Sequence, residues 1–366
     1  MRFKERFRTR AAWGAVLAAA ALIACGPAGH TAVPALATAS ATASAGATPT
    51  ATASPTAWDS PLPHPIIIAD RGNSRIIEVT PDKQVVWTFP APGGLPAGQS
   101  FVGGDDAFFT PGGGQIISNE EMNGTIAIID YATRQVVWQY GHPGVEDYRP
   151  GFLNYPDDAY LLPDGVVAVS DIRNCRELFI NQQKQVVAEW GQAAHCTSDP
   201  PKYLSSPNGD TPLPNGDLLI TEINGGAGDS RAVRITRDGQ VVWNVRIPDV
   251  FYGSDAQLLP DGDILTVDYS RPGKIVIFNP ATGKIDWEYK PASGEAMLDH
   301  PSIAEALPNG NILVSDDYRD RLVVIDRATK AIVWQYGHTD VAGTAPGFLN
   351  TPDGMDSDVY HHLGGH

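Results

Sequence analysis

One position of a repeated sequence phrase carries oxygen-bearing side chains that could bind a cation. Aligning the phrase on its turn proline brings into one column Asp105, Asp157, Asn208, Ser254, Ser302 and Asp353. The next position holds Asp106, Asp158, Gly209, Asp255, Ile303 and Gly354. If such carboxylates met on one axis, they would repel and raise one another's pKa values unless a cation or water lay between them. Ca²⁺ binds oxygen ligands of these kinds. We therefore predict a ligand site here that includes Asp255, with Asp157 and Asp353 as candidate metal ligands.

A second column lies at the end of the following apolar run. It contains Asp70, Asn119, Asp171, Glu222, Asp268 and Asp316, and where a turn proline precedes the residue the spacing is eight. A carboxylate that ends a strand can accept hydrogen bonds from the backbone N–H groups of the next turn. We interpret this column as structural.

No nucleophile–base pair and no histidine-rich metal set is visible from the spacing, so no catalytic residue is assigned. His300 stands two residues before Ser302 and could be a general base, a ligand or a loop cap. Arg173 and Arg271 follow acids of the second column. These three residues are the catalytic candidates if the protein is an enzyme.

The repeated phrase itself predicts short antiparallel strands. Its turn word is Leu-Pro-Asp/Asn-Gly, in which proline presets φ and glycine supplies the positive φ of a tight hairpin. The turn prolines Pro111, Pro163, Pro214, Pro260 and Pro308 follow one another at intervals of 52, 51, 46 and 48 residues. Four strands fit that period, which is typical of a propeller blade.

A duplicated segment indicates how the repeats close. The words Trp-Gln-Tyr-Gly-His and Pro-Gly-Phe-Leu-Asn occur at 138–154 and again at 334–350, and the second copy opens a unit that the chain does not finish. We predict an all-β, six-bladed β-propeller closed by a shared blade. Its inner strand would run from about 350 to 360, and its other strands would lie near 65–70, 74–80 and 84–89.

An open array of repeats is the alternative. Because strands alternate in direction, both columns should ring the same mouth of the channel.

Three stretches resemble known propeller families. Asp70-Arg71-Gly72-Asn73-Ser74-Arg75-Ile76 resembles the NHL-type repeat, in which an acid, an asparagine and an arginine organise the turn into the third strand. The stretch at 129–138 is similar to the PQQ-like quinoprotein repeat, with Asp, Thr and Trp in the same order. The phrase at 308–313 resembles secreted six-bladed arylsulfotransferases, whose central histidines carry sulfate. Here only His300 stands at the start of an inner strand. The likeness covers about 65–362 and implies the fold, because such repeats occur in enzymes, binding proteins and scaffolds.

The N-terminus predicts export. Residues 1–25 combine a basic head with an apolar run that ends Leu22-Ile23-Ala24-Cys25, which resembles the lipobox of bacterial lipoproteins. That resemblance implies cleavage before Cys25 and lipidation of it; an ordinary secretory signal or an uncleaved anchor is the alternative. Residues 26–57 contain almost only Ala, Thr, Ser, Pro and Gly, which predicts a flexible linker. Residues 58–366 would form the propeller. Cys175 and Cys196 form an even pair, which in an exported chain favours a disulfide.

The net charge of the chain limits the classes of partner that it can bind. Residues 1–24 carry five basic and one acidic side chain, so their removal takes the formal net charge from −16 to −20. A chain with this net charge is not expected to bind nucleic acid or an anionic membrane surface. We therefore expect it to contact the membrane only through the lipid anchor. We predict a monomeric lipoprotein on the outer face of the membrane that binds a small molecule or a protein partner through an acidic mouth. Ca²⁺ fits that mouth, whereas PQQ is disfavoured because quinoprotein dehydrogenases usually have more blades. The alternative is an enzyme at the mouth, either a quinone-dependent oxidoreductase or an arylsulfotransferase-like enzyme.

Overall fold

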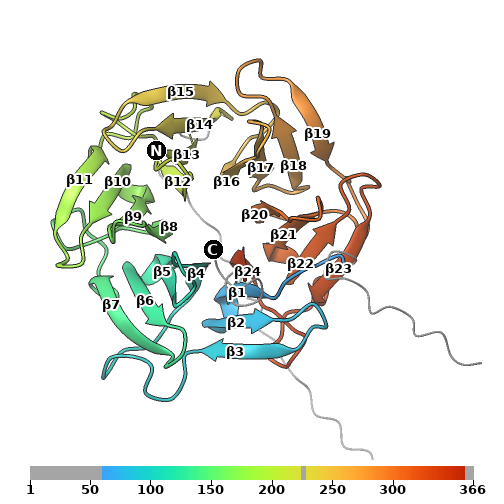
Figure 1. Ribbon diagram of the computed structural model, residues 1–366, viewed down its shortest axis with the longest axis horizontal. Helices are drawn as coiled ribbons and strands as arrows, with labels where there is room; N and C mark the ends of the chain where they lie inside the picture. The colour runs from blue at the N-terminus through green and yellow to red at the C-terminus, as the bar shows by residue number, and fades with distance from the viewer. Residues whose placement is uncertain (1–59, 224–227, 359–366) are drawn as a thin grey trace, which may run out of the picture. The chain divides into compact units, whose positions relative to one another are not determined.

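The computed structural model describes residues 60–223 and 228–358, which form six four-stranded antiparallel sheets arranged as blades around a centre (Figure 1). This confirms the predicted six-bladed propeller. The predicted signal segment with Cys25, the whole predicted linker at 26–57 and the end of the last predicted strand at Tyr360 lie outside the described residues. None of the helices in the described part is long and apolar enough to cross a bilayer.

Each blade runs from an inner strand at the channel to an outer strand at the rim. The inner strands are β24 (Pro352–Ser357), β4 (Gly104–Phe109), β8 (Pro156–Leu161), β12 (Pro207–Pro212), β16 (Gly253–Leu258) and β20 (Pro301–Ala306). The second strands are β1 (Ile66–Asp70), β5 (Gln115–Glu120), β9 (Val167–Asp171), β13 (Leu218–Ile223), β17 (Ile264–Asp268) and β21 (Ile312–Asp316). The third strands are β2 (Arg75–Val79), β6 (Thr125–Asp130), β10 (Arg176–Ile180), β14 (Ser230–Ile235), β18 (Lys274–Phe278) and β22 (Arg321–Ile325). The outer strands are β3 (Val85–Phe89), β7 (Gln135–Gly141), β11 (Val186–Gly191), β15 (Val241–Arg246), β19 (Ile285–Tyr289) and β23 (Ile332–Gly337).

Blade 1 is the shared blade, and we number blades 1 to 6 in the order in which their second strands occur. Its inner strand β24 pairs with β1 near the start of the ring, with Ile66 opposite Ser357 and Ile68 opposite Met355 (Figure 1). The strand also bonds to both neighbouring blades. Phe109 N donates to Asp356 Oδ2 at 2.7 Å, and Ser315 Oγ donates to Pro352 O at 3.1 Å. The end of the described chain therefore closes the ring rather than leaving an open sheet edge.

Every inner strand contains a β-bulge at the two positions that the sequence alignment singled out. In blade 3, for example, Pro156 faces Asp171 and Ala159 faces Val169, so Asp157 and Asp158 together oppose one residue. The same shift occurs in the other five inner strands. A bulge bends the strand and re-aims its side chains. It therefore lets two successive residues of a strand contribute to the channel.

Tryptophans of the outer strands bond to the adjacent blade. In four of the six outer strands, the indole Nε1 donates to a backbone carbonyl in the turn between the third and fourth strands of the next blade. The pairs are Trp87 with Tyr131, Trp138 with Gln182, Trp287 with Arg327, and Trp334 with Pro81, at 2.8, 3.2, 2.8 and 2.9 Å. The last pair joins blade 6 to blade 1, so the ring closes at its rim as well as at its centre.

Candidate ligand-binding channel

The second column has the predicted structural role, but its acids accept from side chains of the following turn, and the backbone N–H donors lie in the loop before the inner strand and not in that turn. Asp70 Oδ2 accepts from Arg75 Nε at 2.6 Å and from Asn73 Nδ2 at 2.8 Å, while its Oδ1 accepts from Asn350 N at 2.8 Å. Asp171 repeats the pattern with Arg176, Asn174 and the N–H of Asn154. These acids anchor the loops that lead into the inner strands. We call the face that carries these loops the loop face.

In blade 2 this role belongs to Glu120, one residue after the aligned Asn119. Glu120 accepts from Val102 N at 2.7 Å and from Asn123 Nδ2 and Thr125 Oγ1 at 3.0 Å. The hairpin before it is one residue longer, because Thr110 pairs with Gln115 whereas Leu162 pairs with Val166. Asn119 instead donates to Pro156 O of blade 3 at 3.0 Å.

The first column forms a buried ring at the loop face. Its six side chains, Asp105, Asp157, Asn208, Ser254, Ser302 and Asp353, are at most 8% exposed. Asn208 donates to Asp157 Oδ2 and to Ser254 Oγ, and it accepts from the Tyr252 hydroxyl at 3.1 Å. The structure therefore brings together the predicted binding residues of this column.

Arg71 places its guanidinium group among these carboxylates. Its Nη1 lies 2.8 Å from Asp105 Oδ1 and 2.9 Å from Asp353 Oδ2, and its Nη2 pairs with Glu121. Burial lowers the pKa of Arg71, but the three carboxylates outweigh this effect and the pKa is raised. Part of the predicted cation site thus already holds a cation from the chain itself.

A second layer of carboxylates lies beside this ring, at the second bulge position. Asp106, Asp158 and Asp255 are at most 9% exposed. Burial, followed by repulsion from neighbouring carboxylates, raises the pKa of Asp106 and Asp158 well above the usual range. Burial also raises the pKa of Asp157 to about 7 and that of Asp255 to about 6. In Asp255 the hydrogen bonds from Ala256 N and Thr211 Oγ1 oppose the shift.

The layer depends on two glycines of the same column. A Cβ atom on Gly354 would lie 2.2 Å from Asp106 Oδ1, and one on Gly209 would lie 2.4 Å from Asp255 Oδ1. Neither contact leaves room for a side chain. The glycines therefore supply the space that the carboxylates of neighbouring blades occupy.

His300 lies at the loop face beside Asp299. Its Nδ1 is 2.7 Å from Asp299 Oδ1, while Arg271 pairs with the other oxygen of Asp299. The ring centroids of Tyr318 and Tyr269 lie 4.4 and 4.9 Å from that of the imidazole. His300 has a φ of 54°, a conformation that is uncommon for residues other than glycine. Arg173 does not join this group, because it stacks on Tyr155 at 3.5 Å.

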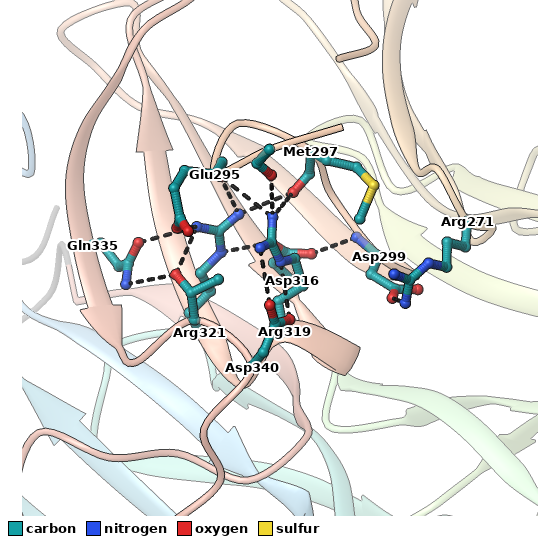
Figure 2. Close-up of polar contacts among 11 residues, drawn as sticks. Arg271, Glu295, Met297, Asp299, Asp316, Arg319, Arg321, Gln335 and Asp340 are labelled. Atoms are coloured by element: carbon teal, nitrogen blue, oxygen red, sulfur yellow. Dashed lines mark hydrogen bonds and ion pairs between the residues drawn. The ribbon is translucent and has the colours of Figure 1, made fainter. Parts of the chain in front are cut away.

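Two arginines hold the segment that presents Asp299 (Figure 2). Arg321 is 1% exposed in its side chain and pairs with Asp316 at 2.7 Å, while its Nη2 donates to the carbonyls of Glu295 and Met297. Arg319 Nη1 donates to Met297 O at 2.7 Å. Asp316 Oδ1 in turn accepts from Asp299 N at 2.7 Å. Asp299 is thus positioned from both sides.

Cys175 and Cys196 form the predicted disulfide, with 5.2 Å between their Cα atoms. Cys175 follows the short helical turn η4 (Ile172–Asn174). Cys196 lies in the long loop between β11 and β12. The disulfide therefore fixes that loop to its own blade at the loop face.

A cavity of about 700 Å³ opens at the other end of the channel, where the inner strands end. We call this end the hairpin face, because its rim consists of the Pro-Asp/Asn-Gly turns at 163–164 and 214–216. Phe108 and Tyr160 line the wall and stack with their ring centroids 4.3 Å apart. Of the predicted binding residues, only Asp255 lines this cavity.

The carboxylates Glu305 and Asp356 join Asp255 in the wall. Burial raises the pKa of Glu305 to about 7, and burial with repulsion from Glu305 raises that of Asp356 well above its usual range. The sequence alignment did not select Glu305 or Asp356, because they stand past the bulge where the repeats no longer share residue types. Arg71 and Glu121 were also missed, although both directly follow the acidic position at the end of a second strand.

The comparisons with known proteins agree with the repeat and the fold. Residues 201–298 match a PQQ-like repeat family described as outer membrane protein assembly factor BamB. This confirms the PQQ-like repeat predicted from the sequence. No curated protein sequence matches the chain.

Solved structures share the architecture at low identity. A protein of unknown function from Bacteroides caccae is 17% identical, with a TM-score of 0.54 over 80% of this chain and 97% of that one. A chain of the nidogen/laminin complex is 11% identical, with a TM-score of 0.56 over 81% of this chain and 98% of that one. Hydrazine synthase of Kuenenia stuttgartiensis is 16% identical, with a TM-score of 0.51 over 73% of this chain and 75% of that one. Such likenesses reflect the fold, which enzymes and binding proteins share.

Proposed function

We propose that this propeller is a binding protein that holds a small organic cation in the cavity at the hairpin face. The observation that carries the proposal is the cavity of about 700 Å³ whose wall combines an aromatic stack with buried carboxylates. Ligand pockets of proteins typically measure about 300–1,000 Å³ and are mostly apolar with a few polar groups. Phe108, Tyr160, Ile303 and Met355 would contact the apolar body of the ligand.

The charges of the wall favour a cationic ligand. Glu305 Oε2 is buried and has no hydrogen-bond donor among the described residues. Ser357 bonds to the carboxyl group of Glu305, but one unpaired buried oxygen remains costly when the group is ionised, and an ammonium group would relieve that cost. The arginine at the rim, Arg237, is engaged elsewhere: it lies 3.5 Å from Asp164 and stacks on Phe179. Once ionised, Asp255 and Glu305 would therefore give the interior a negative potential.

Calorimetric titration with matched ligands tests the proposal. A panel of arylalkylamines, beginning with phenethylamine, would be compared with the alcohols of the same shape, such as 2-phenylethanol. We expect the amines to bind at least about tenfold more tightly, which corresponds to one lost charge-assisted hydrogen bond. Glu305→Gln and Asp255→Asn should weaken amine binding and leave alcohol binding unchanged. Asp82→Asn, at an exposed turn, is the matched control.

The pH dependence gives a second readout. Because burial raises the pKa of Asp255 to about 6 and of Glu305 to about 7, both carboxyls are largely neutral at pH 5.5. Amine affinity should therefore rise from pH 5.5 to pH 8. Equal affinity for amines and alcohols, or no binding by any member of the panel, would contradict the proposal.

We also propose that the protein is exported and anchored by a lipid on Cys25 at the outer face of the membrane. The support is the sequence of residues 1–25, and the Cys175–Cys196 disulfide is compatible with an oxidising compartment. Metabolic labelling with an alkyne fatty acid should mark the wild-type protein but not Cys25→Ser. Absence of label from the wild-type protein would reject the anchor.

The second candidate function is an enzyme at the loop face. The Asp299–His300 pair favours it, because a carboxylate that orients an imidazole prepares a general base or a group carrier. The resemblance to arylsulfotransferases suggests sulfuryl transfer from an aryl sulfate to a phenol, and quinone-dependent oxidation is the other chemistry to test. His300→Ala should abolish turnover of p-nitrophenyl sulfate. A wild-type protein that is inactive with aryl sulfates and with quinone acceptors would reject this function.

A further inference from the structure

We infer that the channel also binds one Ca²⁺ ion, held by Asp106 of β4 and by Asp157 and Asp158 of β8. This inference goes beyond ligand binding at the hairpin face, because it concerns a different group of residues between blades 2 and 3 and does not depend on that proposal.

The geometry brings three carboxylates together. One oxygen from each of Asp106, Asp157 and Asp158 lies within 4.8 Å of the others. All three side chains are at most 8% exposed. The bulge explains how two successive residues of β8 both reach the channel. The cluster is thus built into the backbone of two neighbouring inner strands.

An unpartnered oxygen points to a bound ion. Asp158 Oδ2 is buried and finds no hydrogen-bond donor among the described residues. The carboxyl group of Asp106 lies next to that of Asp158, so one acceptor faces another. Two acceptors at such a distance require either a cation or a proton between them.

Residues of the chain already pair with the neighbouring acids but leave this cluster open. Arg71 pairs with Asp105, Glu121 and Asp353. Asn208 donates to Asp157 Oδ2, which leaves the other oxygen of Asp157 for a ligand. Gly209 and Gly354 keep side chains out of the space beside Asp158 and Asp106. The groups around them therefore supply too few cations and donors to balance three ionised carboxylates, which a bound cation would do.

The donor set selects Ca²⁺ among common metals. All three ligands are carboxylates, and no histidine or cysteine belongs to the set. Hard oxygen ligands suit Ca²⁺ and Mg²⁺, and Ca²⁺ accepts 6–8 oxygens in flexible geometry, with water completing the shell. Mg²⁺ requires a regular octahedron and retains its own waters, which a buried cluster on two strands accommodates poorly. The ion would tie blade 2 to blade 3 near the channel axis.

Thermal unfolding of the whole protein tests the site. The protein would be stripped with EGTA and then melted at pH 7.5 without metal, with 1 mM Ca²⁺ or with 1 mM Mg²⁺. A ligand that binds only the folded state stabilises it, so we expect the melting temperature to rise with Ca²⁺ and to rise less with Mg²⁺. Native mass spectrometry of the reloaded protein should show the added mass of one calcium ion.

Two variants distinguish Ca²⁺ binding at this site from a general effect of Ca²⁺ on an acidic protein. Asp158→Asn should weaken Ca²⁺ affinity roughly tenfold or more, because the charge of the ligand set controls affinity. Without metal the same variant should melt no lower than the wild type, because it removes one of three repelling carboxylates. This opposite sign distinguishes loss of the site from misfolding. Asp82→Asn, on the surface, should keep the full Ca²⁺ response.

Three results would overturn the inference. The first is a melting temperature that does not respond to Ca²⁺, with no retained calcium. The second is an Asp158→Asn variant that responds to Ca²⁺ as the wild type does. The third is a wild-type protein stabilised by lower pH but not by Ca²⁺, which would show that protons hold the carboxylates together.

Discussion

Glu177 of β10 and Asp210 of β12 form a carboxyl pair between blades 3 and 4, and both side chains are fully buried. Ser170 Oγ donates to Glu177 Oε2 at 3.0 Å, and the carboxyl groups of Glu177 and Asp210 share a hydrogen bond. Burial raises the pKa of Glu177 to about 8. Burial, followed by the neighbouring Glu177, raises the pKa of Asp210 well above its usual range. The folded protein therefore retains a proton here that the unfolded chain has lost.

The variant Glu177→Gln should make stability less dependent on pH. An unfolded glutamate has a pKa near 4.3, so the folded state holds an extra proton between that value and about 8. Stability from this proton is complete at low pH and is lost as the pH rises through about 8. Glutamine has no proton to lose and can donate its amide to Asp210. At pH 9 we expect the variant to be more stable by about 1–3 kcal/mol, the usual cost of a buried group without a partner.

Urea unfolding of both proteins at pH 5.5, 7 and 9 measures this difference. Near pH 5.5 the two free energies of unfolding should lie close together. Glu189→Gln, on the exposed neighbouring strand β11, is the control and should follow the wild type. A Glu177→Gln variant that is destabilised equally at every pH would rule out the shared proton.

The residue types in the sequence predicted the roles of some side chains in the turns and in the channel, but not of others. Asp70 was recognised as a turn acid because asparagine and arginine follow it in the NHL-like stretch, and Asp171 because it falls in the same repeat column; the structure shows the corresponding hydrogen bonds for both. Arg71 was not recognised as the cation of the acidic ring. In sequence it is 34 residues from Asp105 and 282 from Asp353, and only ring closure brings the three together.

At the scale of elements, four of the outer strands are bonded to the next blade through the tryptophans described above. Three of these tryptophans also lie beneath a lysine or arginine. The pairs are Lys83 with Trp334, Arg134 with Trp87, and Lys330 with Trp287. The indole thus gains both a hydrogen bond and a cation over its ring. Because the same device recurs from blade to blade, its contribution can be measured one blade at a time.

The variant Trp334→Phe should weaken the rim bond that closes the ring. It removes the donor to Pro81 O at 2.9 Å and reduces the buried ring, while Trp334 is only 8% exposed. A carbonyl left without its donor costs about 1–3 kcal/mol when buried, and Pro81 is partly buried. We expect a loss of about that size in denaturant unfolding.

Trp243→Phe is the matched control for this substitution. Trp243 lies in β15 and packs against the core, but no rim bond of this kind is found for it among the described residues. The loss of stability in Trp243→Phe should come from the smaller ring alone, and it should be smaller than the loss in Trp334→Phe. If the two variants were destabilised equally, the rim bond would contribute nothing measurable.

The sequence predicted the strands well, because the turn words determine the hairpins directly. Leu162 N donates to Val166 O at 2.8 Å, and Gly165 has the positive φ that the turn needs. The bulges were not predicted, since no residue type marks them. They arise where backbone groups of the inner strand bond to second-strand hydroxyls, as when Ser118 donates to Asp106 O and Thr266 to Asp255 O.

At the scale of the whole molecule, the two ends of the channel differ in a way that the repeat could not reveal. The aligned columns lie toward the loop face, where Arg71 and partly buried tyrosines such as Tyr252 and Tyr269 fill the space. The cavity lies at the hairpin face, where the last residues of the inner strands differ from blade to blade. Phe108, Tyr160 and Met355 come from three blades and share no residue type. A site of this kind depends on side-chain volume, which alignment of repeats does not record.

Ring closure by β24 leads to a prediction for the chain that ends at Leu349. Without β24, β1 would present an unpaired edge, which promotes association with other chains. The chain would also lose the pairing of Met355 with Ile68, the Asp353–Arg71 ion pair, and the bonds of Asp356 and Pro352 to blades 2 and 6. Folded domains are stable by only about 5–15 kcal/mol, so we expect the truncated chain to lose cooperative unfolding and to self-associate.

A peptide of residues 350–358 should reverse this loss when added to the truncated chain. It carries the Asn350 N–H that Asp70 accepts at 2.8 Å, together with all of β24. Because every group that it pairs with lies on the truncated chain, binding should restore a single melting transition and a monomeric elution volume. A scrambled peptide of the same composition should restore neither. If the truncated chain were monomeric and melted as the full chain does, blade 1 would be stable with three strands, and closure by β24 would not hold the propeller together.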